Sequence, residues 1–531
     1  LLRHPCDGAV GFAILEAMVS PPTKLLLALP WIAFGACTSP GAGVAAASNA
    51  ETAKRPNVLI LLTDDQRHDA LGAWGDGVLE TPHMDRLADE GLAFRRAYVA
   101  GSVHGAVCAP SRAMLHTGRH FEELPLGMTS LWSAPAEERG VYEGPTLFEV
   151  FDKAGYETFA TGKWHNGSRS ISRGLDGGAA IFFGGMSDHD KVPVHPFDPT
   201  GTYPGEARSI AEGFSSELFA DAAIDFLEQR DPAAEDPFLC YVSFTAPHDP
   251  RTAPEPFASA HDPASIPVPP NFAPEHPFPI GHLRVRDEVL APHPRTEAVV
   301  QEHIAGYWAM IEHLDAQVGR ILAALDAAGV SDDTIVVLAS DNGLAVGQHG
   351  LLGKQNLYEH SAGVPLVLTG PGIAAGESQA LCYLHDLFPT LCDLAGLPTP
   401  DTVTARSLAP IVRGDADAVR DHVMLSYRTK AAHAEDTSYM RAVVTPRWKY
   451  LRSLHGTGEE AADVTRLFDL ADDPWETADL STAPGMAGPL ATLSPLLDAE
   501  LAAVGDPVRP DRPGWNIERD TGKTTPDSCD L

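Results

Sequence analysis

The stretch NVLILLTDD, residues 57–65, indicates the fold of this chain. Residues 57–63 form a nearly continuous apolar run rich in leucine and β-branched side chains, which is typical of a parallel strand buried on both faces. Two aspartates, Asp64 and Asp65, follow at the carboxyl end of the predicted strand. Because ligands of open α/β sheets bind at the carboxyl ends of strands, both carboxylates are candidates for a functional site.

The same alternation of strand and helix signals continues along the chain. It predicts strands at 158–161, 237–244, 334–339 and 364–368, and helices at 81–91, 146–154, 215–229, 304–329 and 384–395. Strands that alternate with helices predict an α/β fold, with a large, mainly parallel (mixed) sheet flanked by helices on both faces.

The pattern changes from about Asp421 onward. The segment YMRAVVTPRWKYLRSL predicts a hairpin that turns at Thr445 and Pro446, and LFDLADDPWETADL predicts a strand followed by an acidic turn. These features indicate a smaller C-terminal domain with an antiparallel sheet and a helix. We therefore divide the chain into a leader and tether (1–54), an α/β catalytic domain (55–420), an antiparallel subdomain (421–505) and a polar tail (506–531).

The first part of the chain resembles an export signal. From Met18, the sequence runs through Lys24, an apolar stretch at 25–34 and then small residues, which is the order of a secretory leader. The apolar stretch is too short to span a bilayer. Two kinds of processing stay open, a lipid anchor on Cys37 or plain cleavage after one of the alanines at 45–47. Both predict an exported protein, periplasmic or at the cell surface.

The composition limits the classes of partner. With 38 basic and 72 acidic residues, the net charge is −34, which disfavours nucleic acid and anionic membranes as partners. An anionic substrate would require a few local cations to overcome this field. Outside the leader, the sequence contains an odd number of cysteines, so at least one has no intramolecular disulfide partner. A disulfide between Cys382 and Cys392 is one option, and the sequence leaves pairing among Cys240, Cys382, Cys392 and Cys529 open.

Polar clusters also follow other predicted strands. They comprise Lys163 with His165, His248, and Asp341 with Asn342, while Cys108, Arg112 and Lys354 lie in nearby loops. Singly, such residues are often helix caps, turn residues or solvated side chains, but their joint arrangement is hard to explain in that way. Asp64, Asp65, Asp341 and Asn342 offer only hard oxygen donors, which select Ca²⁺ or Mg²⁺ over Zn²⁺.

Several motifs together resemble the type I, formylglycine-dependent sulfatases of the alkaline phosphatase superfamily. CAPSRAMLHTGR, which begins at Cys108, is similar to the family signature C-x-P-S-R-x-x-x-x-T-G-R. PNVLILLTDD, GKWH, APHDP, SDNG and the C-terminal LFDLADDPWETADL resemble further segments of the same family, so that the likeness covers roughly residues 55–480. One departure is His116, which stands where the family usually has leucine, and we expect it to change the packing of its helix.

The resemblance implies a catalytic mechanism. A formylglycine-generating enzyme would oxidise Cys108, and the hydrated aldehyde would attack sulfur to give a covalent sulfo-enzyme. One Ca²⁺ would be held by Asp64, Asp65, residue 108, Asp341 and Asn342. Arg112 would support this centre, and Lys163 and Lys354 would contact the sulfate. His165 would accept a proton from the second hydroxyl and His248 would protonate the leaving oxygen, although these two roles could be exchanged.

The substrate is less clearly indicated. The likeness is strongest to exported bacterial polysaccharide sulfatases, which favours exo-acting desulfation of a sulfated carbohydrate. Asp249 and Arg251, beside His248, are the better candidates for substrate binding. In the segment 184–201, His189, Lys191 and His195 are either part of a subsite wall or solvated loop residues. The proline-rich segment 254–294 is predicted to be a long ordered loop near the site.

Three other functions remain open. One is a phosphonate monoester or phosphodiester hydrolase of the same superfamily, which shares the formylglycine nucleophile. A two-metal enzyme like alkaline phosphatase is disfavoured by Cys108, since that class uses serine or threonine. The third is a non-catalytic, glycan-binding surface lipoprotein, which the presence of every mapped catalytic position disfavours.

Overall fold

The computed structural model describes residues 54–506, except for 76–77, 104, 132, 232–233, 278–284, 430–437 and 456–461. The predicted leader with Cys37, and the tail beyond Asp506, lie outside the described residues. Within the described part of the chain, every helix is too short or too polar to cross a membrane.

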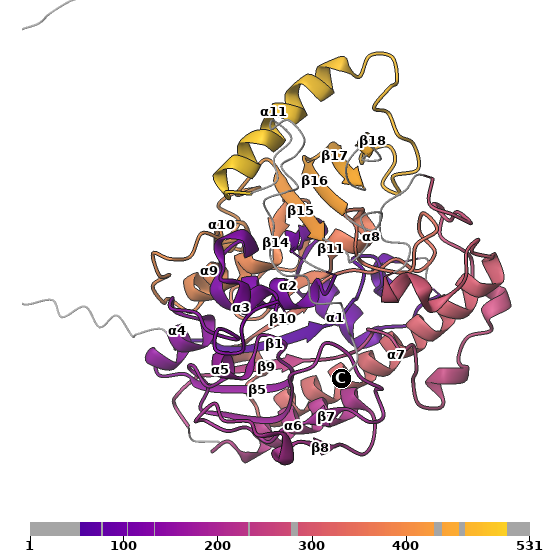
Figure 1. Cartoon of the computed structure of the whole chain (residues 1–531). Helices are drawn as coiled ribbons and strands as arrows, with labels where there is room; N and C mark the ends of the chain where they lie inside the picture. Colours follow the sequence, from indigo (N-terminus) through magenta and orange to yellow (C-terminus); the bar gives the residue numbers. More distant parts are fainter. Residues whose placement is uncertain are drawn as a thin grey trace, which may run out of the picture. The chain divides into compact units, whose positions relative to one another are not determined.

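A mixed sheet forms the centre of the fold, as the sequence predicts (Figure 1). Its order is β13-β2-β12-β10-β1-β9-β5-β6. Strands β10, β1, β9, β5 and β6 run parallel, whereas β12 is antiparallel to β10. Their bounds are β1 (Asn57–Thr63), β2 (Leu92–Phe94), β5 (Glu157–Lys163), β6 (Gly177–Phe182), β9 (Phe238–Ser243), β10 (Thr334–Ser340), β12 (Leu366–Thr369) and β13 (Gly376–Ser378).

The predicted strand at 364–368 is two strands in the structure. Pro365 separates β11 (Gly363–Val364) from β12, and β11 pairs with β3 (Ala97–Tyr98) of a different sheet. Proline has no backbone N–H to donate to a ladder, which explains why the strand is interrupted there.

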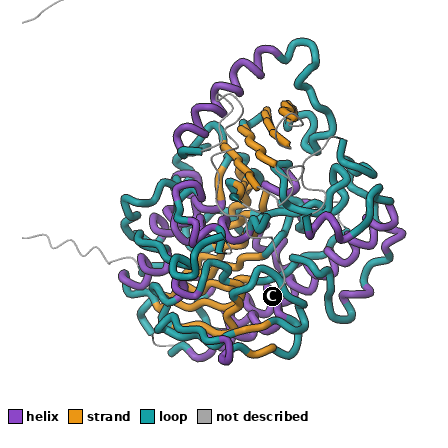
Figure 2. Tube along the Cα trace, in the orientation of Figure 1, coloured by secondary structure: helices purple, strands orange, loops and turns teal. Residues whose placement is uncertain are grey.

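Helices cover both faces of the central sheet (Figure 2). Side chains of β1 alternate between the two hydrophobic cores: Ile60 faces one and Leu61 faces the other. The first core includes residues of α2 (Cys108–Thr117), α4 (Leu147–Lys153) and α9 (Leu387–Leu394). The second includes residues of α1 (Pro82–Glu90), α6 (Ser215–Gln229) and α7 (Glu297–Ala327). Shorter elements are α3 (Leu126–Thr129), α5 (Ser168–Ile171), α8 (Glu359–Ala362), α10 (Ala409–Val412), β7 (Pro193–Val194), β8 (Ser209–Ile210) and β14 (Cys382–Tyr383).

A second sheet of five strands follows toward the C-terminus. It comprises β15 (Val423–Thr429), β16 (Ser438–Val444), β17 (Trp448–His455) and β18 (Ala462–Asp469), with α11 (Ala487–Ala503) packed against it. The hairpin at Thr445 is confirmed, because β16 pairs antiparallel with β17. The boundaries that we assign to the domains stay predictions.

The fifth strand of this sheet comes from the N-terminal half of the chain. Strand β4 (Gly101–Ser102) pairs parallel with β15 and leads directly into the segment that carries Cys108. Gly101 has φ of 121°, and a Cβ there would lie 1.8 Å from the carbonyl oxygen of Ser426. Only glycine permits this approach, so the candidate nucleophile segment is tied to the C-terminal sheet.

The suggested disulfide between Cys382 and Cys392 does not form. Both thiols are free and fully buried, Cys382 on β14 and Cys392 on α9. Each belongs to the first hydrophobic core and serves as a small apolar side chain. Cys240 is also free and buried, and Cys529 lies outside the described residues.

His116, the departure from the family pattern, is buried among aromatic rings on α2, and a change of packing relative to the family stays a prediction. Its ring is 1% exposed and stacks on Trp164 with centroids 4.5 Å apart. Phe148 and Tyr241 contact its edges, and neither ring nitrogen has a hydrogen-bond partner. Burial, reinforced by the nearby charge of Arg112, lowers the pKa of His116 to about 3.

Candidate active site

The polar residues predicted from strand ends meet at one edge of the central sheet. Strands β10, β1, β9 and β5 are neighbours and parallel, so their carboxyl ends coincide. Asp64 and Asp65 follow β1, Asp341 follows β10, Lys163 ends β5, and His248 follows β9 after a short loop. The sheet topology therefore gathers side chains that are up to 277 positions apart in the sequence.

Cys108 opens helix α2 at the centre of this group. It is 1% exposed, and its Sγ lies 3.3 Å from Asp64 Oδ1 and 3.1 Å from Lys354 Nζ. Burial, together with the negative charges of Asp341 and Asp64, raises the pKa of the thiol well above its usual value. The unmodified side chain is therefore held as a neutral thiol, which is a poor nucleophile.

Three buried cations face three buried carboxylates. Lys163 Nζ donates to Asp64, and Lys354 Nζ lies 2.6 and 2.8 Å from the two carboxylate oxygens of Asp65. Arg112 Nε donates to Asp341 Oδ2 at 2.8 Å. The other side of the guanidinium donates to the carbonyl of Lys163 at 2.7 Å and to Ser243 Oγ.

These ion pairs set the protonation of the carboxyl groups. Burial disfavours ionisation of Asp64, but Lys163, Arg112 and Lys354 outweigh it and lower its pKa. Burial raises the pKa of Asp65 to about 7; Lys354 lowers it, while Asp64 and Asp341 raise it further. Carboxylates crowded in this way make a candidate cation site, because a cation would offset the repulsion that raises the pKa of Asp65.

The oxygen donors of the site fit a hard divalent cation, whereas Cys108 and His248 add a thiol and an imidazole nitrogen. Ligand atoms of Asp64, Asp65, Cys108 and His248 lie within 4.8 Å of one another. Asn342 Oδ1 is buried and has no hydrogen-bond partner, although its Nδ2 donates to Asp65. An unpartnered buried amide oxygen beside three carboxylates is the chemistry that Ca²⁺ prefers. The structure adds His248 to the predicted ligands. Asp341 contacts the cluster through a hydrogen bond, in which its Oδ1 accepts from the backbone N–H of Asp65 at 3.3 Å.

The two candidate histidines differ in their surroundings. His248 Nε2 lies 3.7 Å from Asp65 Oδ2, while its Nδ1 lies 2.8 Å from the carbonyl oxygen of Asp249. This contact fixes Nδ1 as the donor and leaves Nε2 toward the site. His165 is 2% exposed with φ of 59°, and a Cβ at Gly185 would lie 3.2 Å from its Cε1 and Nε2.

The residues predicted to bind substrate have contacts within the protein. Asp249 Oδ1 lies 3.2 Å from His248 Nδ1, which favours an orienting role for this carboxylate. The Arg251 guanidinium contacts His303 and lies 3.5 Å from the carbonyl oxygen of Leu352, and its Nε is buried without a partner. Direct contact of either residue with a substrate stays a prediction.

The three candidate residues of segment 184–201 lie in different environments. His189 is buried beneath the site, where its Nε2 contacts the carbonyl of His248 at 2.8 Å and its Nδ1 contacts Ser215 at 3.1 Å. Lys191 is exposed and pairs with Asp190 at 3.4 Å. His195 bridges to Ile181 on β6.

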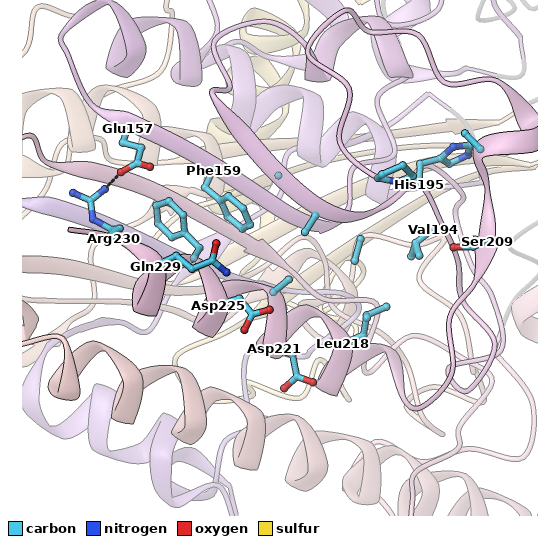
Figure 3. Close-up of a pocket in the computed structure, with 17 residues that line it drawn as sticks. Glu157, Phe159, Val194, His195, Ser209, Leu218, Asp221, Asp225, Gln229 and Arg230 are labelled. Atoms are coloured by element: carbon cyan, nitrogen blue, oxygen red, sulfur yellow. Dashed lines mark hydrogen bonds and ion pairs between the residues drawn. The ribbon is translucent and has the colours of Figure 1, made fainter. Parts of the chain in front are cut away.

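His195 also lines a hollow of about 920 Å³ between the β5–β6 edge and α6 (Figure 3). Its lining contains none of the predicted catalytic residues. The Glu157–Arg230 ion pair lies at one end of this hollow, and Asp221 and Asp225 project from α6 (Figure 3). The catalytic cluster is thus a site apart from it.

Two residues support the site in ways that the sequence did not predict. Ser243 anchors Arg112 and is the last residue of β9, so its position at a strand end was a usable signal. His189 supports the His248 loop through a tertiary contact, and no local pattern in the sequence marks such a contact.

Comparison with known proteins identifies the family. The sulfatase family model matches residues 56–397, and a model for the C-terminal part of N-sulphoglucosamine sulphohydrolase matches residues 347–501. An N-acetylglucosamine-6-O-sulfatase of Bacteroides thetaiotaomicron is 26% identical and covers 87% of this chain and 88% of its own. An ulvan-active sulfatase of Formosa agariphila is 28% identical over 85% of this chain and 82% of its own.

Solved structures show the same fold. One, of a protein in complex with its substrate D-glucosamine-2-N,6-O-disulfate, superposes with a TM-score of 0.71 and 24% sequence identity, over 87% of this chain and all of the other. A mixed sheet with carboxylates, lysines and a buried cysteine at its carboxyl edge thus belongs to a sulfuric ester hydrolase. The chain is a member of the sulfatase family.

Proposed function

We propose that the chain releases sulfate from sulfated carbohydrates through a formylglycine made from Cys108. The observation that carries this proposal is the position of Cys108 Sγ, buried within 3.3 Å of both a carboxylate and Lys354 Nζ while its pKa is raised. A thiol that is kept protonated is unsuited to attack on its own. Conversion to an aldehyde, which hydrates to two hydroxyls, would provide an oxygen nucleophile at the same point.

We further propose that Asp64, Asp65, Asp341 and Asn342 hold one Ca²⁺ together with residue 108. When bound, the ion would supply a Lewis acid that withdraws charge from the sulfate. Lys163 and Lys354 would add point charges on the sulfate oxygens. Arg112 would keep Asp341 ionised and in place, because its Nε and Nη1 are committed to protein acceptors.

Proton transfers at two histidines complete the proposed cycle. One hydroxyl of the diol loses its proton to solvent, and its oxygen attacks sulfur. The bond from sulfur to the leaving oxygen breaks, and His248 protonates that leaving oxygen. His165 then takes the proton of the second hydroxyl. The electron pair of that O–H bond forms the aldehyde C=O, and sulfate leaves with the oxygen that had attacked. The aldehyde hydrates again for the next turnover.

Variants of the two histidines distinguish the acid from the base. If His248 is the acid, His248→Ala should slow hydrolysis of alkyl and sugar sulfates much more than of 4-nitrophenyl sulfate, whose leaving group needs no proton. His165→Ala should slow both kinds of substrate and accumulate the sulfo-enzyme. The opposite pattern would exchange the two assignments.

The names of similar proteins favour a carbohydrate substrate. Two of the relatives act on sulfated sugars or on ulvan, and one structural neighbour holds a disulfated glucosamine. We therefore propose a sulfated carbohydrate, cut in exo fashion, with Asp249 and Arg251 near the sugar.

A sulfate-release screen tests this function. The chain would be co-expressed with a formylglycine-generating enzyme, supplied with Ca²⁺ and assayed on sulfated mono- and oligosaccharides, with Cys108→Ala as the control. Mass spectrometry of the peptide around residue 108 reports the modification. A fully active enzyme with an intact Cys108 thiol would refute the nucleophile. Faster turnover of phosphonate monoesters or phosphodiesters would favour that hydrolase class, and glycan binding without sulfate release would favour a binding protein.

We also propose that the protein is exported, on the basis of its leader sequence. Fractionation of cells that express the full chain should place it in the periplasm or at the cell surface. Labelling with a fatty acid that Cys37→Ala abolishes would distinguish a lipid anchor from plain cleavage.

A further inference from the structure

The loop that carries Lys354, residues 350–358, forms neither a helix nor a strand. Residues 350–358 precede the short helix α8, and the described chain forms only turns there. Yet Lys354 is 3% exposed, and its Nζ lies within 3.1 Å of both Asp65 and Cys108. Nearby residues hold part of the backbone from which this lysine extends, because the Gly353 carbonyl accepts from Ala345 N–H at 3.1 Å and from Asn356 Nδ2 at 3.4 Å. Further contacts come from outside the loop.

Glu288 supplies contacts from outside the loop to the backbone N–H groups just before Lys354. It lies in the 3-10 helix η6 (Arg286–Leu290), within the long loop predicted near the site, and is 3% exposed. Its carboxylate accepts from the backbone N–H of Leu352 at 3.0 Å and of Gly353 at 2.8 Å, immediately before Lys354. Two consecutive backbone amides donate to this one carboxyl group and form a clamp.

Other contacts hold the clamp in place. Arg295 Nη2 donates to Glu288 Oε2 at 2.8 Å and is itself buried. Asp287 Oδ2 accepts from Gln355 Nε2 at 2.6 Å, on the other side of Lys354. The same Gln355 amide donates to the carbonyl of Gly105 at 3.1 Å, which connects this loop to the segment before Cys108.

The geometry points to Glu288 as a positioning residue for Lys354 in the sulfatase reaction. We propose that its carboxylate sets the backbone of Leu352 and Gly353 so that Lys354 Nζ reaches the sulfate position beside residue 108. This inference rests on the proposed contact of Lys354 with sulfate. Glu288 does not touch the reacting atoms, so its effect passes through the lysine.

The size of the effect follows from the geometry. A long lysine side chain amplifies a small change in its backbone, and a displacement of about 1 Å in an active site can cost about 100-fold in rate. Removal of a residue that orients a ligand-contacting side chain typically lowers activity by about 10- to 100-fold. Glu288→Ala should therefore lower kcat/KM by about 10- to 100-fold.

A double-mutant cycle tests the proposal on the matured, Ca²⁺-loaded enzyme with 4-nitrophenyl sulfate. Glu288→Ala, Lys354→Ala and the double variant are compared with the parent. If Glu288 acts through Lys354, its removal should change kcat/KM by less than about 3-fold once Lys354 is already alanine. An equal loss in both backgrounds, or no loss in either, would overturn the proposal.

Three further variants separate positioning from charge and from general stability. Glu288→Asp keeps the charge but is one methylene shorter, so it should lose activity as the alanine does; full activity would show that only charge matters. Glu288→Gln keeps an acceptor oxygen and should lose less, and it carries the cycle if the alanine variant does not fold. Asp315→Asn is the matched control, because this buried carboxylate also accepts from two consecutive backbone amides, those of His83 and Met84.

Asp315→Asn should reduce stability and leave kcat/KM within about 3-fold of the parent, as expected for a residue remote from the reacting groups. A loss as large as that of Glu288→Ala would show that the assay reports stability and would overturn the proposal. If Lys354→Ala itself has no effect, the assigned role of Lys354 fails and this inference with it. If Lys354→Ala reduces activity while Glu288→Ala does not, only the positioning role fails.

Discussion

His116 provides a test of the structure that does not depend on catalysis. The substitution His116→Leu replaces a buried imidazole, whose two nitrogens lack hydrogen-bond partners, by the residue that the sulfatase family usually has there. An unsatisfied buried polar group costs about 1–3 kcal/mol, and leucine removes this cost while keeping most of the contact with Trp164. We therefore expect the variant to be more stable than the parent already at pH 8.

The gain should increase as the pH falls. The pKa of His116 is about 3 in the folded protein, against about 6.5 in the unfolded chain, so the unfolded state binds more protons in between. Native stability is then lost as the pH falls below about 6.5. At pH 5 the unfolded chain gains about 2 kcal/mol from protonating this one side chain. This energy depends little on the pKa of His116 in the folded protein, because pH 5 is well above that pKa.

Urea titrations of the parent and of His116→Leu, at pH 8 and at pH 5 with constant Ca²⁺, measure this difference. Circular dichroism is the better signal, since the indole of Trp164 touches the substituted position. The free energy of unfolding gained by the variant should rise by about 2 kcal/mol between the two pH values. Leu115, a buried neighbour on the same helix, is the control, because Leu115→Ala removes no titratable group and its effect should be the same at both pH values. A gain from His116→Leu that is the same at both pH values would refute a buried, neutral His116.

Three further perturbations have defined outcomes. Gly185→Ala places a Cβ 3.2 Å from the His165 ring and should lower kcat/KM. Gly488→Ala has open space around its Cβ and should leave kcat/KM unchanged, although alanine in helix α11 should add up to about 1 kcal/mol of stability. Equal kinetics for the two variants would contradict the position of His165. Lys449→Met should lower the free energy of unfolding by about 3–5 kcal/mol in urea titrations, because Glu359 and Glu476 lose the cation that they share. The control, Lys54→Met, removes an exposed ion pair and should lower it by less than about 1 kcal/mol. Raising the ionic strength from about 10 to 150 mM shortens the Debye length from about 30 to 8 Å. Because salt then screens the repulsion between the substrate and the protein's net charge of −34, kcat/KM for a sulfated sugar should rise. A fall in kcat/KM would show that long-range attraction dominates.

The sequence predicts the sheet and its polar edge because both depend on local patterns. The apolar run before Asp64 has the length and composition of a buried strand, and β1 occupies those residues. Since parallel strands align their carboxyl ends, Asp65, Lys163 and Asp341 could be expected to meet before any coordinates were known. Where the local pattern was interrupted by Pro365, the prediction of a single strand was wrong.

What the sequence could not predict depends on contacts between distant segments. From the sequence, His189 was a candidate for a subsite wall or for a solvated loop residue, yet it is buried and its Nε2 contacts the carbonyl of His248 at 2.8 Å. Glu288 was one acid among many in a proline-rich segment, and only the fold brings it to Leu352 and Gly353. Such roles have no spacing rule, since the two partners approach each other through the tertiary structure alone.

The local charge of the site explains how such an acidic protein can act on an anion. Asp64, Asp65 and Asp341 are matched by Arg112, Lys163 and Lys354, all within 3% exposure, so that the buried groups cancel. The proposed divalent ion would then leave about two positive charges facing a sulfate monoester, in a region where solvent screens little. In the part of the chain that the structure describes, most carboxylates are at least partly exposed, so water and salt screen their contribution to the net charge of −34 effectively. The electrostatic potential at the reacting atoms is therefore positive, because it is determined by the three buried ion pairs and the proposed divalent cation. The net charge of the whole chain is negative and would suggest the opposite.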